Sequence, residues 1–114
     1  MITVTLQRSP NGYIRRFTAI GHAGYAEEGS DIICAAISAI AQTTIGSLQD
    51  LAGLHPDYRL ENGLIECQTS DPDDMAPEQY RTARTLMDAM ALGCLQIRNS
   101  YGKQYIKVKE AIFT

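Results

Sequence analysis

Residues 21–48 read GHAGYAEEGSDIICAAISAIAQTTIGSL, and the interpretation of the whole chain starts from this stretch. Its first part, residues 21–30, contains three glycines and no apolar periodicity, so we predict a loop there. From residue 32 onward apolar side chains recur at helical spacing, which predicts a helix over residues 32–52. Ser30 and Asp31 are both good N-cap residues for that helix.

Two side chains of this stretch have complementary acid–base chemistry. Cys34 lies in the first turn of the predicted helix, where the helix dipole and unpaired N–H groups favour a thiolate. His22 lies across the loop and can accept the thiol proton, then return it to a leaving amine. The N–H groups at the helix start would also stabilise a tetrahedral oxyanion. We therefore predict a catalytic pair, with Cys34 as nucleophile and His22 as general base.

Two further polar residues lie close to Cys34 in sequence, and each has two interpretations. Asp31 either orients the imidazole of His22 or only caps the helix. The hydroxyl of Ser38, one turn beyond Cys34, either reaches the thiolate or bonds back to a helix carbonyl. The sequence leaves both choices open.

The predicted loop has a role if the site binds a peptide. Gly21, Gly24 and Gly29 make it the segment that would admit a substrate and close over it. Glu27 and Glu28 would then attract a basic substrate, although such a pair is also typical of a solvated surface.

Structural interpretations of the same cysteine and histidine compete with catalysis. Free cysteine is among the most frequently buried residue types, and a loop histidine can simply bond to a backbone carbonyl. On that interpretation the protein is a non-enzymatic binding module. A thiol-redox protein is a third hypothesis, which is weakened because no resolving cysteine lies nearby in sequence.

The remainder of the chain predicts an α+β fold. Alternation and turn residues, including Asn11-Gly12 and Asn62-Gly63, indicate two hairpins and a closing strand. The predicted strands cover residues 2–7, 13–20, 58–61, 64–69 and 105–109. With a second helix opening around Pro77, the order is ββαββαβ, a mainly antiparallel mixed sheet with two long helices.

The second helix is apolar on more than one face. One stripe repeats at steps of three and four, and it consists of Tyr80, Ala83, Met87, Met90, Cys94 and Ile97. Leu86 and Leu92 lie off this stripe. We therefore expect the helix either to be enclosed in the core or to form a dimer interface.

Length and composition restrict the class of protein. A chain of 114 residues with 45% hydrophobic residues predicts one globular domain over residues 1–114. A net charge of -3 argues weakly against direct binding of nucleic acid. We see neither a signal peptide nor an apolar run that approaches the length of a membrane span, and we expect a cytoplasmic protein.

The three cysteines lack the spacing of a metal site. Cys34, Cys67 and Cys94 form no CxxC pair, so we expect no metal and no cofactor. Cys67 lies on the apolar face of its strand and Cys94 on the apolar stripe of its helix, which predicts that both are buried core residues. His55, beside a proline in a connector, is expected at the surface.

The motif as a whole resembles a known family. The run Gly21-His22-Ala23-Gly24-Tyr25-Ala26, followed by Gly29-x-Asp31-Ile32-Ile33-Cys34-Ala35-Ala36-x-Ser38, closely resembles the bacterial ribosomal-processing cysteine proteases of the Prp family. The length of the chain and the order of its elements are also similar to that family. The resemblance implies that the protein removes a short N-terminal extension from a large-subunit ribosomal protein, bL27, whose precursor would be its peptide substrate.

The same resemblance implies roles for individual residues and an assembly state. It implies Cys34 as nucleophile, His22 as base, and Asp31 and Ser38 as supporting positions. It also implies a homodimer formed through the helices, in agreement with the two apolar faces of the second helix.

Overall fold

A computed structural model of the chain describes residues 1–24, 26 and 31–114. Within these residues the chain forms five strands and two helices in the predicted order ββαββαβ. The strands are β1 (Ile2–Arg8), β2 (Ile14–Ile20), β3 (Asp57–Glu61), β4 (Leu64–Gln68) and β5 (Ile106–Ile112). The helices are α1 (Ile32–Asp50) and α2 (Pro77–Tyr101), and a short 3₁₀ turn, Pro72–Asp74, precedes α2. The α+β fold class is confirmed.

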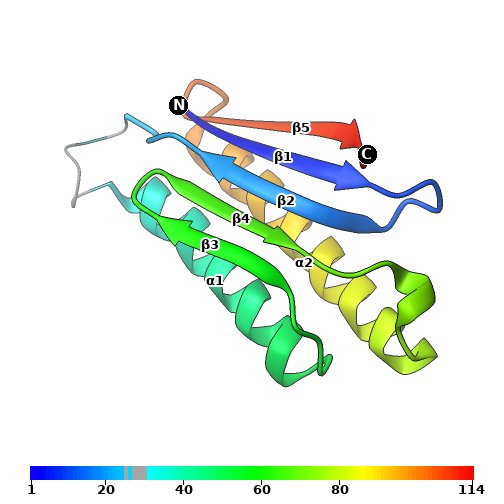
Figure 1. The fold of residues 1–114 in the computed structure, drawn as a ribbon. Coiled ribbons are helices and arrows are strands. Elements are labelled where there is room, and N and C mark those ends of the chain that lie inside the picture. Colours follow the sequence, from blue (N-terminus) through cyan, green and yellow to red (C-terminus); the bar gives the residue numbers. More distant parts are fainter. Residues whose placement is uncertain (25, 27–30) are drawn as a thin grey trace.

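The five strands form one mixed sheet in the order β3-β4-β2-β1-β5 (Figure 1). Strands β1 and β2 form one antiparallel hairpin, and β3 and β4 form the other. The antiparallel pairing of β2 with β4 joins the two hairpins. After α2 the chain returns along the opposite edge, where β5 lies parallel to β1. The parallel ladder runs from Ile2 opposite Ile106 to Arg8 opposite Ile112, so β5 extends further than its alternation predicted.

Both helices cover the same face of the sheet, which gives a two-layer molecule (Figure 1). Because alternate strand residues point to the same face, Ile2, Val4 and Leu6 of β1 are buried under the helices. The core is completed by Phe17 of β2 and by apolar residues of α1 and α2. The predicted burial of Cys67 and Cys94 is confirmed, since their exposed fractions are 0% and 2%.

Helix α1 forms because its start is capped and one face is apolar. The Asp31 carboxylate accepts the N–H groups of Ile33 and Cys34 at 2.9 and 3.1 Å, so Asp31 is the N-cap. The buried residues of α1 are Ile33, Ile37, Ala41, Thr44, Ile45 and Leu48. Against α2 the packing is close at Gly93, where an added Cβ would lie 3.1 Å from Cδ1 of Ile40.

Our expectation that no apolar segment approaches the length of a membrane span was wrong for α1. This helix, Ile32–Asp50, has 19 residues and a mean hydropathy of 1.4, so by length and composition alone it could cross a membrane. It packs on α2 and contributes to the core, and core helices of folded domains commonly share these properties.

Helix α2 has one buried face and one exposed face. Ala83, Met87, Met90 and Cys94 of the predicted stripe are buried. Leu92 lies on the opposite side and is 57% exposed. Within the described part of the chain the helix is therefore not enclosed on both sides, and the first of the two expectations for it was wrong.

A buried hydroxyl pair fixes the start of β2 to the segment after β4. The Tyr13 hydroxyl and Oγ1 of Thr69 lie 2.8 Å apart, and the two residues are 0% and 2% exposed. Burial is also the main reason that the pKa of Tyr13 is raised above its ordinary value.

Replacing one partner of this pair should destabilise the protein more than replacing both. Tyr13→Phe leaves the Thr69 hydroxyl buried without its partner, so we expect a loss of about 1–3 kcal/mol in the free energy of unfolding. Adding Thr69→Val should recover part of that loss. Urea unfolding of the single and double variants measures both effects, and a double variant that is less stable by the full sum of the two single losses would contradict the coupling.

Candidate active site

The end of β2 brings His22 to the mouth of a pocket. Gly21 donates its N–H to the carbonyl of Gly63 at 2.9 Å, which extends the pairing of β2 with β4 by one residue. Gly21 has a φ of +104°, and a Cβ added there would lie 2.5 Å from the Met1 carbonyl oxygen. Only glycine fits this position without displacing the backbone, so the residue before His22 is fixed by steric constraint.

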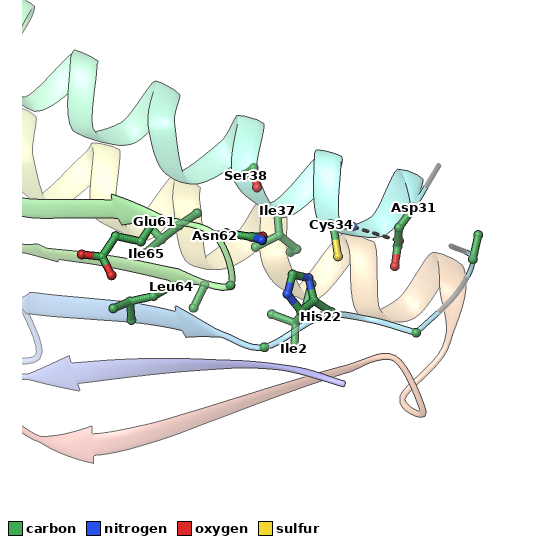
Figure 2. Close-up of a pocket in the computed structure, with 15 residues that line it drawn as sticks. Ile2, His22, Asp31, Cys34, Ile37, Ser38, Glu61, Asn62, Leu64 and Ile65 are labelled. Carbon is green, nitrogen blue, oxygen red and sulfur yellow. Dashed lines mark hydrogen bonds between the residues drawn. The ribbon is translucent and has the colours of Figure 1, made fainter. Parts of the chain in front are cut away.

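Cys34 lies in the first turn of α1 and faces the same pocket. The Ala23 N–H donates to Sγ of Cys34 at 3.3 Å, which ties the segment after His22 to the thiol. Figure 2 shows the His22 imidazole on one side of the sulfur and the Asp31 carboxylate on the other. The structure thus brings the predicted cysteine and histidine together in one site.

The pocket has a volume of about 270 Å³ and three walls. One wall is α1, with Cys34, Ile37 and Ser38, and the second is the chain around His22. The third wall is the turn between β3 and β4 and the first residues of β4, namely Glu61, Asn62, Gly63, Leu64 and Ile65. A site of this shape can hold part of an extended peptide beside the thiol.

Burial and a neighbouring carboxylate both act on the acidity of the Cys34 thiol. Burial raises the pKa of Cys34 above its ordinary value, and the Asp31 carboxylate raises this pKa further. The Ala23 N–H acts in the opposite direction but does not outweigh burial. These contributions oppose the thiolate that a position at the helix start favours.

Asp31 occupies the N–H groups that were expected to stabilise an oxyanion. Its carboxylate already accepts from Ile33 and Cys34, so these two donors point at the cap rather than at the pocket. Of the two interpretations of Asp31, helix capping is the one seen in the structure. Its position away from His22 gives no support to an orienting role (Figure 2).

Some of the other predicted site residues line the pocket, and others lie outside the part of the chain that the structure describes. Ser38 lines the pocket, as do Gly21 and Gly24. Gly29, Ser30, Glu27 and Glu28 lie outside the described residues. His55 is exposed in its connector, as predicted.

Cys67 and Cys94 are poor nucleophiles where they lie. Burial raises the pKa of Cys67 to about 12 and that of Cys94 to about 11. Among the described residues no group of three histidine, cysteine, aspartate or glutamate side chains is arranged to hold a metal ion.

The third wall of the pocket was missed by sequence reasoning. Asn62 and Gly63 were recognised as a hairpin turn, but their position beside His22 depends on the pairing of β2 with β4. The only available signal was the strength of the turn itself, which does not indicate which strand lies next to the hairpin.

Comparison with known proteins identifies the family. The sequence pattern of the family described as cysteine protease Prp matches residues 1–107. The ribosomal processing cysteine protease Prp of Bacillus subtilis is 30% identical over 103 residues, which cover 89% of this chain and 90% of that protein.

Solved structures agree with the fold. The essential ribosomal processing protease Prp of S. aureus, in complex with a covalently linked product peptide, superposes with a TM-score of 0.82 at 24% identity, covering 96% of this chain and 99% of that one. SMU.848 from Streptococcus mutans superposes with a TM-score of 0.79 at 22% identity, covering 99% and 96% of the two chains. Together with the match over nearly the whole sequence, these findings show that the chain belongs to the Prp family of cysteine proteases.

Proposed function

We propose that this cysteine protease removes a short N-terminal extension from the precursor of a large-subunit ribosomal protein, bL27. The observation that carries the proposal is the convergence of Cys34 and His22 on one pocket in a chain of the Prp family. Its Bacillus subtilis relative is named as a ribosomal processing protease. The S. aureus protein has been crystallised with a substrate peptide and with a covalently linked product peptide.

In the proposed mechanism Cys34 starts as a thiol and His22 activates it. The imidazole takes the thiol proton as the sulfur attacks the scissile carbonyl carbon, and the negative charge passes to the carbonyl oxygen as the C–S bond forms. Burial and the Asp31 carboxylate raise the pKa of Cys34, in agreement with a mechanism in which the imidazole removes the proton during the attack. The Ala23 N–H, 3.3 Å from Sγ, would stabilise the developing negative charge on the sulfur.

The second half of the reaction returns the enzyme to its starting state. His22 gives its proton to the departing amine, which leaves a thioester between Cys34 and the N-terminal part of the substrate. Water, deprotonated by His22, then hydrolyses the thioester and releases a carboxylate and the free thiol. Ser38, one turn from Cys34 on the same pocket wall, is placed to contact the bound peptide.

The peptide would bind in extended form between the chain around His22 and the β3–β4 turn. The residues at this position combine apolar surfaces, such as Ile37 and Leu64, with the carboxylate of Glu61 at the rim. We place the reaction in the cytoplasm, where reducing conditions keep Cys34, Cys67 and Cys94 as the free thiols that the structure contains.

Replacing either member of the pair should stop processing without unfolding the protein. Cys34→Ala should reduce cleavage of a synthetic precursor peptide to background, and His22→Ala should lower kcat by about 10²–10⁴. Mass spectrometry of the peptide products measures both. Cys94→Ala serves as the control, because its buried thiol faces the core, and it should keep kcat.

The outcome also separates a protease from a binding module. A Cys34→Ala protein that still processed the peptide would show that the proposed mechanism is wrong. If neither the parent protein nor its variants cleaved the peptide but all bound it, the binding-module hypothesis would be favoured.

We also propose that the protein is a homodimer that associates through the helical layer. The side of α1 and α2 facing away from the sheet carries a groove of about 330 Å³. Small and apolar residues line it, including Ala39, Ile40, Leu86, Ala89 and Gly93. Leu92, 57% exposed on α2, adds a large apolar side chain to this uncovered face.

A charge introduced on the helical face should weaken the dimer. Leu92→Lys should shift the sedimentation equilibrium toward monomer, because burying the ammonium group in an apolar interface is unfavourable. Leu51→Lys is the matched control, since Leu51 is 69% exposed at the end of α1. Equal weakening by both changes, or a parent protein that is monomeric, would contradict this interface.

Two variants should separate the effect of Asp31 on the pKa of Cys34 from its effect on the stability of α1. Asp31→Asn keeps an acceptor for the helix cap but removes the negative charge that raises the pKa of Cys34, so that pKa should fall toward its ordinary value. Asp31→Ala should in addition lower the free energy of unfolding by about 0.5–2 kcal/mol through loss of the cap.

Alkylation of Cys34 by iodoacetamide across pH, followed by mass spectrometry, measures the first effect, and urea unfolding measures the second. The thiolate is the reacting form, so the midpoint of the pH profile should be lower in Asp31→Asn than in the parent protein. A higher midpoint would contradict the role assigned to the carboxylate.

A further inference from the structure

The turn between β3 and β4 is in contact with the His22 side chain. A Cβ added to Gly63 would lie 3.1 Å from Nε2 of His22, 3.7 Å from Cε1 and 3.8 Å from Cδ2. The Nε2 end of the imidazole therefore packs against the position that a side chain of residue 63 would take. Figure 2 shows the ring between this turn and Cys34.

The same turn is fixed relative to the backbone of His22. The 2.9 Å hydrogen bond from the Gly21 N–H to the Gly63 carbonyl joins the turn to the residue directly before the histidine. Further along, the β2–β4 ladder pairs Ile20 with Leu64. The distance between the turn and the histidine is therefore set by a rigid sheet, so the turn can act as a fixed wall for the ring.

His22 needs such a wall because it is exposed at the pocket mouth and follows a strand end. A histidine side chain with two free torsion angles populates several rotamers, and a general base acts only from the one that faces the nucleophile. Asp31, the candidate that sequence reasoning offered for this task, lies on the far side of Cys34 (Figure 2).

We propose that Gly63 is a positioning residue for His22: the space left by its missing side chain receives the imidazole and holds it toward Cys34. The proposal rests on the role of His22 as general base given above. It assigns to the Asn62-Gly63 turn a function in the reaction in addition to closing a hairpin.

Gly63→Ala tests the contact directly. The new Cβ would lie 3.1 Å from Nε2, which is tighter than an ordinary contact, so the imidazole has to shift by a few tenths of an ångström. Because a misplacement of about 1 Å can reduce a rate by about 10²-fold, a shift of a few tenths of an ångström should lower kcat by up to about 10-fold. Gly63 also lines the pocket, so KM is measured beside kcat, and a positioning role predicts that the loss appears mainly in kcat.

Gly12→Ala is the matched control. Gly12 also lies in a hairpin turn, with a φ of +87° against +78° for Gly63, so both alanines strain the backbone in a similar way. An added Cβ at Gly12 would meet Nη2 of Arg84 at 3.3 Å, the end of a long side chain that donates to the Asn11 carbonyl, and neither Gly12 nor Arg84 lines the pocket. This variant should lose stability like Gly63→Ala and keep kcat, with the folded fraction of each measured by urea unfolding.

A second variant covers the case in which Gly63→Ala does not fold. Asparagine tolerates a positive φ better than alanine, so Gly63→Asn keeps the turn and still places a Cβ against the ring. The Cε1–Hε1 signal of His22 in an NMR spectrum reports the ring environment, with His55 as an internal reference. We expect this signal to shift in both Gly63 variants and to stay in place in Gly12→Ala.

Two results would overturn the proposal: a kcat in the folded Gly63 variants equal to that of Gly12→Ala, or an unchanged His22 signal. Failure of the proposed function looks different. A parent protein that cleaves no precursor peptide would contradict the protease assignment, while the NMR comparison would still decide whether residue 63 sets the position of the ring.

Discussion

The antiparallel pairing of β2 with β4 is the interaction on which the rest of this structure depends. It joins two hairpins that are separated by a helix in the chain, and so makes one sheet of them. The last hydrogen bond in this direction, from Gly21 to Gly63, places the end of one hairpin beside the turn of the other. The pocket forms at this junction, because α1 begins close to the point where β2 ends. Fold and site are therefore consequences of the same ladder.

The cap of α1 adds a second constraint with opposing effects. Asp31 fixes the backbone of Cys34 by accepting its N–H, which orients the thiol toward the pocket. The same carboxylate, together with burial, raises the pKa of that thiol. In the proposed mechanism, a thiol held in this way depends on the His22 imidazole for its activation. Gly63 contacts the His22 ring, and the Ala23 N–H donates to the Cys34 sulfur. Both contacts would help to hold the ring and the sulfur in position for the transfer of the proton.

Local sequence signals were sufficient for the elements but not for their arrangement. Alternation in β1, the turns at Gly12 and Gly63 and the periodicity of α1 each depend on neighbouring residues, so they were predictable. The adjacency of β2 and β4 depends on which apolar faces pack together across the whole chain. For that reason the Cys34–His22 pair was anticipated from its motif, while the contribution of the β3–β4 turn was not. The contributions that raise the pKa of Cys34 could not be seen in the sequence, because burial and the position of the capping carboxylate are properties of the folded state.

The junction between the hairpins also has a consequence for folding. The contact between Gly21 and Gly63 requires a long loop to close, which makes such non-local pairing slow. A partly folded chain in which α1 had formed but β2 had not yet paired with β4 would carry Cys34 without the β3–β4 turn beside His22. Proteolytic competence would thus arise with this non-local step of folding, so that a newly made chain has no active nucleophile while its own backbone is still exposed.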